Sequence, residues 1–169
     1  DTLLASVVNN TGVIEARTVE QHEGTITLLG GMEAGTVNVG GTLDAPAPNE
    51  GNGGFIETSA AHVHVDDNAR ITTKAASACT ESCRSGNSGA WLIDPVDFTI
   101  AASGGDMTGA TITANLLNGN VTIMSTSGAA GTSGNINVND AVTWAANLFT
   151  LNAQNNININ AVMDATATA

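Results

Sequence analysis

Apolar and polar residues alternate along most of this chain, in runs too short to form helices. Alternation with a period of two is typical of a strand with one buried face. Between the runs lie Gly, Asn, Asp and Ser, which tolerate the backbone angles of turns. The pattern predicts short, half-buried strands at the apolar positions Ile26/Leu28, Val37/Val39, Val63/Val65, Ile71/Thr73, Phe98/Ile100, Val121/Ile123, Ile136/Val138, Phe149/Leu151 and Ile157/Ile159.

Four segments share one five-residue pattern of glycine, polar, apolar, polar, apolar. The copies are Gly24-Thr-Ile-Thr-Leu28, Gly35-Thr-Val-Asn-Val39, Gly41-Thr-Leu-Asp-Ala45 and Gly134-Asn-Ile-Asn-Val138. Many short strands fit either a sandwich of hairpins or a solenoid of parallel strands. Matched two-residue turns would favour hairpins, but here the linkers vary in length. The irregular linkers favour a solenoid.

We therefore expect an all-β fold, a right-handed parallel β-helix formed as a single-stranded solenoid over residues 1–169. The right hand follows from the rule for parallel crossover connections. One round of the chain, a coil, takes roughly 20 residues in such a fold, which gives about eight coils and a rod of about 40 Å.

One segment departs from the strand pattern and predicts a short helix near residues 107–118. Asp106 is interpreted as the N-cap, Ile112 and Leu116 have helical spacing, and Gly119 ends the segment. The asparagine-rich run Asn152, Asn155, Asn156, Asn158 and Asn160 is expected to hydrogen-bond with residues of adjacent coils, because amides stack well in register.

Composition and charge narrow the function. The formal charge is −12, and the fixed cations are Arg17, Arg70, Lys74 and Arg84. Such a chain is not expected to neutralise nucleic acid or an anionic membrane. No apolar run approaches the ~20 residues that cross a bilayer, so no membrane insertion is expected. Aromatic residues make up 3% of the chain, which predicts a thin aliphatic core in regular layers.

Cys79 and Cys83 are the two cysteines. A lone Cys-x-x-x-Cys lacks the further ligands that a structural zinc site needs, so a disulfide is favoured. His62 and His64 would share one face of a strand, with Val63 and Val65 on the other. A metal could bind this pair, but no third ligand is evident and a solvent-facing pair is favoured.

Asp66, Asp67 and Arg70 invite comparison with β-helical polysaccharide lyases, which combine carboxylates, Ca²⁺ and a base. An ordinary Asp-Asp-Asn turn between two strands is the favoured interpretation. Asp94 and Asp97 around Pro95 are interpreted as a coil boundary. Gly104-Gly105-Asp106 is similar to calcium-binding nonapeptide repeats, but the pattern occurs in a single copy. It therefore predicts no metal site. We expect no catalytic residue, no cofactor and no enzymatic activity.

Three segments resemble filamentous-haemagglutinin-type exoproteins of two-partner secretion: Gly40-Gly-Thr-Leu-Asp-Ala45, Gly53-Gly-Phe-Ile-Glu-Thr-Ser59 and Trp91-Leu-Ile-Asp-Pro95. Four more follow in that family's usual order: Asp97-Phe-Thr-Ile100, Gly119-Asn-Val-Thr-Ile123, Gly134-Asn-Ile-Asn-Val138 and Asn155-Asn-Ile-Asn-Ile-Asn-Ala161. The resemblance covers nearly the whole chain.

This resemblance implies a large adhesin of a Gram-negative bacterium, secreted through an outer-membrane transporter partner and active in virulence at the cell surface. The chain would be an internal shaft segment downstream of the secretion domain, which its start does not match. Its partner would be a receptor, such as a glycan, on host cells or other bacteria; the receptor-binding residues are unknown. A passive spacer in a contact-dependent toxin-delivery protein and a carbohydrate-active β-helix remain open alternatives.

The chain departs from these relatives between Ala78 and Asn87, where Cys79-Thr-Glu-Ser-Cys-Arg-Ser-Gly86 replaces what resembles a shorter, cysteine-free corner. We expect residues 78–88 to form a protruding loop. It is the most distinctive candidate for a contact surface.

The disulfide can be tested directly on the cysteine pair. We expect titration of the denatured, non-reduced chain with a thiol reagent to find no free thiol, and titration after reduction to find two. Two reactive thiols without reduction would show that Cys79 and Cys83 are not paired.

Overall fold

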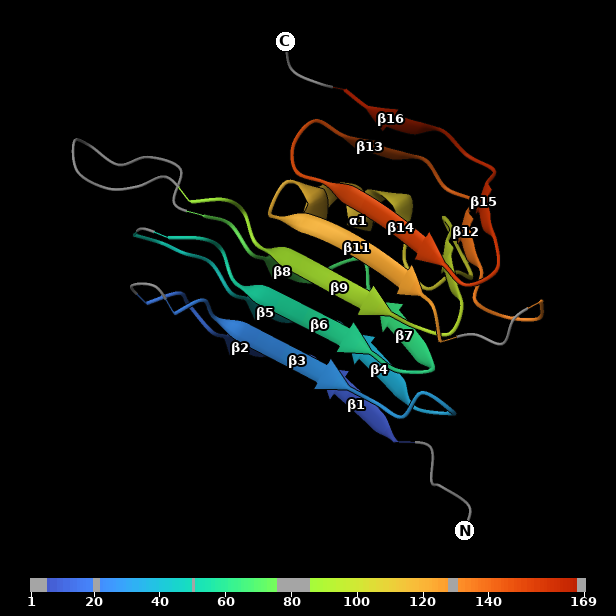
Figure 1. The fold of residues 1–169 in the computed structure, drawn as a ribbon, viewed down its shortest axis with the longest axis horizontal. Helices are drawn as coiled ribbons and strands as arrows, with labels where there is room; N and C mark the ends of the chain where they lie inside the picture. The colour runs from blue at the N-terminus through green and yellow to red at the C-terminus, as the bar shows by residue number, and fades with distance from the viewer. Residues whose placement is uncertain (1–5, 20–21, 50, 76–85, 128–130, 167–169) are drawn as a thin grey trace.

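The computed structural model describes residues 6–19, 22–49, 51–75, 86–127 and 131–166. Within these ranges the fold is mostly β, with one helix, and every pairing between labelled strands is parallel. The parallel β architecture predicted from the alternating pattern is therefore confirmed. The strands stack level upon level between the two ends of the chain (Figure 1).

The strands form three faces. The front sheet is the longest and has the order β14-β11-β9-β6-β3. Its strands are β3 (Thr25–Leu29), β6 (Phe55–Ser59), β9 (Ala90–Asp94), β11 (Asn120–Ser125) and β14 (Phe149–Ala153). The second face contains β1 (Val7–Asn10), β4 (Thr36–Val39), β7 (His62–Val65), β10 (Phe98–Ile100), β12 (Ile136–Val138) and β15 (Ile157–Ile159).

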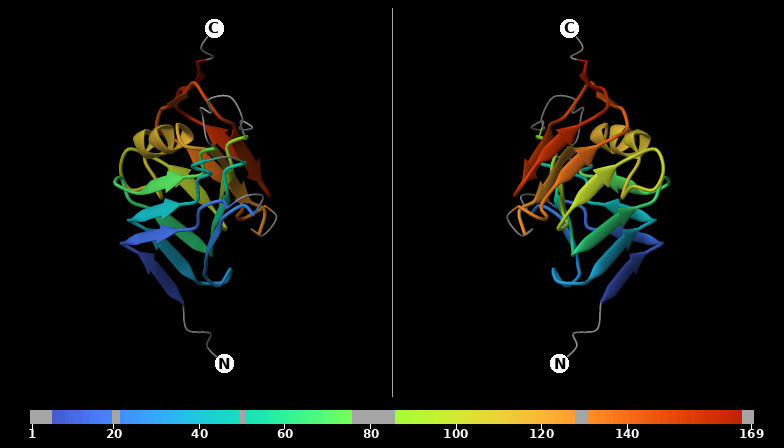
Figure 2. Two further views of the ribbon diagram at one scale, coloured as in Figure 1. Left: turned by 90° about the vertical axis from the view of Figure 1, so that its left-hand side faces the viewer. Right: turned by 90° about the vertical axis from the view of Figure 1, so that its right-hand side faces the viewer.

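The third face contains β2 (Val13–Glu15), β5 (Thr42–Asp44), β8 (Arg70–Thr72), α1 (Gly109–Leu116), β13 (Val142–Trp144) and β16 (Met163–Ala165). The chain visits the faces in a fixed order, β1 then β2 then β3, and repeats that order until β15 and β16. Two side views show the resulting stack, with α1 in its wall (Figure 2).

The number of coils differs from the prediction of about eight. Paired residues lie between 21 positions apart, as for Ile136 and Ile157, and 38 apart, as for Phe98 and Ile136. The second face has six levels, which at the usual strand spacing span about 25 Å rather than 40 Å. The prediction was wrong because several coils carry insertions between their strands, and a uniform repeat of about 20 residues overlooks them.

The helix confirms one prediction and corrects another. Ile112 and Leu116 are fully buried, as their spacing indicated. The N-cap, however, is Thr108, whose hydroxyl accepts from the Thr111 N–H at 3.2 Å. Asp106 does not cap the helix, because its carbonyl and its carboxylate accept hydrogen bonds from β7 and β10 instead. Its carbonyl accepts from Val65 N–H, and its carboxylate accepts from Thr99 N–H at 2.7 Å.

Helix α1 takes the place of a strand between β8 and β13. The Asn115 side chain, 3% exposed, accepts from the Ile71 N–H of β8 at 2.9 Å and donates to Thr111 O at 2.9 Å. Asn118 O accepts from Thr73 N–H, and the Thr113 hydroxyl accepts from Thr143 N–H. These three backbone N–H groups would otherwise bond to a neighbouring strand. The helix and Asn118 after it supply the acceptors instead, because a buried N–H without a partner is costly.

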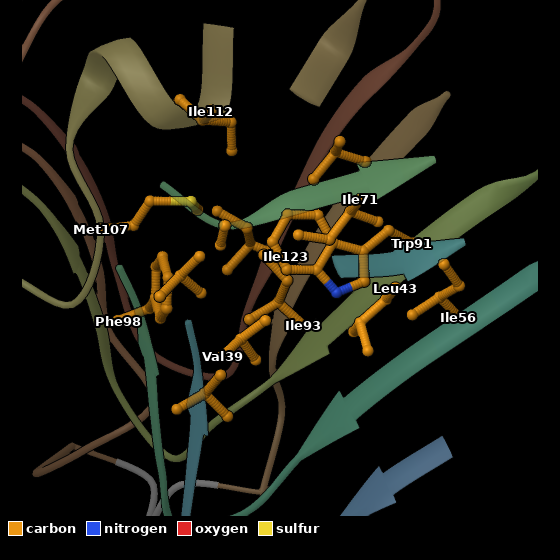
Figure 3. Packing of buried hydrophobic residues seen from close by; sticks show 14 of the residues in the cluster. Val39, Leu43, Ile56, Ile71, Trp91, Ile93, Phe98, Met107, Ile112 and Ile123 are labelled. Carbon is orange, nitrogen blue, oxygen red and sulfur yellow. The ribbon is translucent and has the colours of Figure 1, made fainter. Parts of the chain in front are cut away.

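The core lies inside the three faces and is mainly aliphatic, as predicted (Figure 3). Inward residues of one level stack on those of the next, as Ile56 does on Trp91 and Trp91 on Val121. Trp91 and Phe98 are the two fully buried rings. The Trp91 indole N–H donates to the Thr58 hydroxyl at 3.1 Å, so its polar atom is satisfied within the apolar layer.

The amide of Asn115 provides a test of how α1 is attached. Replacing Asn115 by Ala leaves the buried Ile71 N–H without its acceptor, and we expect the free energy of unfolding to fall by about 1–3 kcal/mol. Asn118→Ala is the matched control, because that side chain bonds only to Ala114 O at 3.3 Å on the surface, and about 0.5 kcal/mol or less is expected. Equal losses for the two variants in urea denaturation would contradict this role of Asn115.

Candidate functional site

The strongest candidate site is a groove beside the start of α1. It consists of two adjoining hollows of about 220 Å³ and 420 Å³, which share Asp67, Ala102 and Thr108 in their walls. The end of β7 and the bend at residues 101–105 form one part, and α1 with Asp140 forms the other. Alanines provide much of the remaining wall: Ala69, Ala101, Ala110 and Ala114. The groove is therefore shallow. Its walls consist largely of small side chains, and carboxylates lie along it.

Asp66 and Asp67 begin the turn that was predicted between β7 and β8. Ala69 N–H donates to Asp66 O at 3.0 Å, which closes the turn and confirms it. One oxygen of Asp67 accepts from the hydroxyls of Thr108 at 2.8 Å and Thr111 at 3.2 Å. Asp67 thus ties the turn to the first residues of α1.

Asp140 completes the start of the helix from the next level. One of its oxygens accepts from Gly109 N–H at 2.8 Å and the other from Ala141 N–H at 2.9 Å. A carboxylate is stabilised at a helix N-terminus by unpaired N–H groups and by the helix dipole. Sequence analysis missed this residue, because Asp140 lies 31 positions from the helix it caps and no local pattern connects them.

Arg70 does not join these carboxylates. It lies on β8, with an exposed side chain, and it is absent from the walls of both hollows. The combination of clustered carboxylates and a cation that a polysaccharide lyase would use is therefore not assembled by Asp66, Asp67 and Arg70 in the described structure. The groove offers hydrogen-bond acceptors and hydroxyls beside small apolar walls.

His62 and His64 face solvent on β7, while Val63 and Val65 are buried, as predicted. His64 Nε2 lies 3.4 Å from Asp66 Oδ1, at the edge of the groove. Within the described ranges, no three His, Cys, Asp or Glu side chains are placed to hold a metal ion. Cys79 and Cys83, and most of the predicted loop at 78–88, lie outside the described residues.

Two carboxylates mark the bend between β9 and β10, where a coil boundary was predicted. Asp97 Oδ1 accepts from the N–H groups of Gly134 and Asn135 at 3.0 and 2.8 Å, and so joins this bend to the level above. Asp94 Oδ1 is buried and has no hydrogen-bond partner among the described residues. Burial and, to a lesser extent, the charge of Glu57 raise the Asp94 pKa above the ordinary aspartate value.

The asparagine run behaves largely as the sequence predicted. Asn158 and Asn160 donate their amides to Asn137 and Asn139 at 2.8 and 2.7 Å, and Asn155 and Asn156 donate to Asn135. Asn152, by contrast, is exposed on β14, opposite Met124 of β11. A similar pair occurs at the other end, where Asn38 donates to Asn9 at 2.7 Å. These amides form part of the outer surface of the second face and hold its levels together.

No protein-family model, curated protein or solved structure matches this chain. Among the described residues, no helix is long and apolar enough to cross a bilayer.

The raised pKa of Asp94 gives a test of pH dependence. The folded chain keeps the Asp94 proton to higher pH than the unfolded chain does, so this group makes the fold less stable as pH rises above the ordinary aspartate pKa. We expect Asp94→Asn to raise the melting temperature at about pH 7 and to leave it nearly unchanged at about pH 3.

Glu33→Gln is the control for that experiment, because it removes one negative charge from an exposed residue. Its effect on the melting temperature should be smaller at about pH 7. An Asp94→Asn variant that melts at or below the parent at that pH would contradict the assignment.

Proposed function

We propose that the chain is a right-handed parallel β-helix and a structural and adhesive segment of a large bacterial surface adhesin, secreted through an outer-membrane partner. The fixed visiting order of the three faces supports the β-helix, since parallel strands need a crossover connection and such connections are right-handed in nearly all cases. The adhesin part rests on the family resemblance of the sequence.

One contact between two of the matching segments supports the resemblance. Two of the three leading segments, Gly53–Ser59 and Trp91–Pro95, contain neighbouring strands of the front sheet, with Ile56 paired to Trp91. The Thr58 hydroxyl of the first segment accepts from the Trp91 indole of the second. These residues therefore stabilise one another across two levels, which gives a physical reason for both segments to occur in the same chain.

A rod of this kind displays its outward residues in rows, and those rows are polar on the second face. Asn9, Asn38 and His64 follow one another on β1, β4 and β7, and Thr99, Asn137 and Asn158 on β10, β12 and β15. Rows of amides and hydroxyls offer donors and acceptors to the hydroxyl groups of a glycan without a deep pocket. The groove beside α1 adds a hollow with carboxylate acceptors to the same flank.

The structural tasks of three acidic residues support a non-enzymatic role. Asp67 and Asp140 bind the first turn of α1, and Asp97 joins two levels. Each carboxylate has a structural task that accounts for it. Incubation with acidic polysaccharides and Ca²⁺ is expected to yield no unsaturated products, and their appearance would favour a lyase instead.

A glycan array tests the adhesive role and locates it. The parent chain is compared with a variant in which residues 79–83 are replaced by two glycines, and with Ala102→Trp, which places a large ring in the wall shared by both hollows. Ala145→Trp is the control, since it adds the same ring at an exposed position outside the groove.

We expect saturable glycan binding by the parent and by Ala145→Trp. Loss of binding on replacing residues 79–83 would place the adhesive surface there, and loss with Ala102→Trp alone would place it in the groove. Absence of binding by the parent to glycans and to host and bacterial cells would contradict the adhesive role and leave a passive shaft.

A further inference from the structure

The chain contains asparagine followed by glycine twice, at Asn52-Gly53 and at Asn118-Gly119. This dipeptide is prone to spontaneous rearrangement, because glycine has no side chain to keep its backbone nitrogen away from the asparagine amide. Both copies lie at corners of the stack, the first between β5 and β6 and the second between α1 and β11. The structure gives the two copies different surroundings.

Hydrogen bonds hold every reacting group of Asn52-Gly53. The Asn52 amide nitrogen donates to Glu23 Oε1 at 3.0 Å, and the amide oxygen accepts from Asn87 N–H at 3.0 Å. The Gly53 N–H donates to Asn87 O at 3.0 Å. An attack of the Gly53 nitrogen on the Asn52 side chain therefore requires all three hydrogen bonds to open first.

The same groups are held far less firmly at Asn118-Gly119. The Asn118 amide nitrogen donates to Ala114 O at 3.3 Å on the surface, which is a long hydrogen bond. The Gly119 N–H has no hydrogen-bond partner within the described ranges. The attacking nitrogen and the side-chain amide that it would attack are therefore nearly free of competing bonds.

Packing requires the glycine of this second copy. A Cβ atom on Gly119 would lie 1.9 Å from Thr73 Oγ1, in the level below. Thr73 is itself fully buried, and its N–H donates to Asn118 O at 3.0 Å. Any other residue type at position 119 would displace Thr73, so the corner between α1 and β11 keeps the reactive dipeptide.

We propose that Asn118 is a site of spontaneous modification, at which the folded chain loses ammonia and forms isoaspartate. The Gly119 nitrogen bonds to Asn118 Cγ, the Cγ–Nδ2 bond breaks, and ammonia leaves with the proton of the Gly119 nitrogen. Water then opens the cyclic imide at one of its two carbonyl carbons, which gives aspartate or isoaspartate. Asn118 is partly exposed, so water reaches it. The modification is independent of the adhesive role.

The rearrangement weakens the attachment of α1. In isoaspartate the chain continues through the side-chain carbon, which lengthens the link between α1 and β11 by one atom. Both ends of this link are fixed, because Asn118 O accepts from Thr73 N–H and Asn120 N–H donates to Gly89 O at 3.0 Å. Both products also add a negative charge just after the C-terminus of α1, where the helix dipole disfavours it.

Peptide mapping by mass spectrometry tests the proposal on the folded chain, incubated in mildly alkaline buffer. Aspartate and isoaspartate are measured separately at positions 52 and 118. We expect conversion at Asn118 to be faster than at Asn52 by about tenfold, because the hydrogen bonds at Asn52 must open first. Exposure alone predicts the reverse order, since Asn52 is exposed and Asn118 is partly buried. In the chain denatured by urea, the two rates should approach each other.

Two variants separate the causes. Glu23→Ala removes the acceptor of the Asn52 amide, and it should accelerate conversion at Asn52 while the rate at Asn118 stays unchanged. Asn118→Gln requires a larger ring and should abolish conversion at position 118. After incubation, the melting temperature of the parent should fall more than that of Asn118→Gln. Circular dichroism checks that both variants fold.

Two outcomes would overturn the proposal. One is an Asn118 that stays intact in the folded chain while the denatured chain converts, because the fold would then protect it. The other is conversion at Asn52 as fast as at Asn118 in the folded chain. Neither outcome bears on adhesion, which the glycan array measures on freshly prepared, unmodified chain.

Discussion

In-register parallel pairing of one level with the next, continuous through the five strands of the front sheet, is the constraint on which the rest of this structure depends. A parallel strand has backbone donors and acceptors on both sides, and burying them without partners is costly. Each coil must therefore present a strand, or a substitute with the same hydrogen-bonding capacity, at every face. The side chains follow from this, because a fixed register places apolar residues above apolar residues inside and amides above amides outside.

The fourth level shows how the constraint is met when the sequence does not supply a strand. Helix α1 contributes Asn115 Oδ1 as the acceptor for the Ile71 N–H of β8, and Asn118 O, just after the helix, accepts from the Thr73 N–H just after β8. Asp67 from below and Asp140 from above hold the first turn of the helix. A cap made by residues of three coils cannot form until those coils have assembled, so this helix depends on the stack as much as the stack depends on it.

The same constraint links the structural and the proposed functional features. Carboxylates that resemble parts of an active site in the sequence are used as caps and joints, while the outer rows of amides and hydroxyls stay available to a partner.

The sequence by itself determined the local features of this protein. The two-residue alternation located β3, β4, β7, β10, β11, β12, β14 and β15, because side chains on a strand point alternately to its two faces. The spacing of Ile112 and Leu116 located the helix, and Asp66-Asp67-Asn68 located a turn. The stacking of Asn158 on Asn137 was also foreseeable, since equivalent residues of a regular repeat lie above one another.

Only the tertiary structure decided which distant residues meet. The number of coils could not be counted from the sequence, because insertions make the distance between paired residues vary from 21 to 38 positions. The N-cap was assigned to Asp106 rather than Thr108, because the sequence does not show that the Asp106 carboxylate accepts from Thr99 N–H or that its carbonyl accepts from Val65 N–H on another strand. The groove, the Asp140 cap and the Thr58–Trp91 contact have the same origin, as each joins residues from different coils that local patterns do not connect.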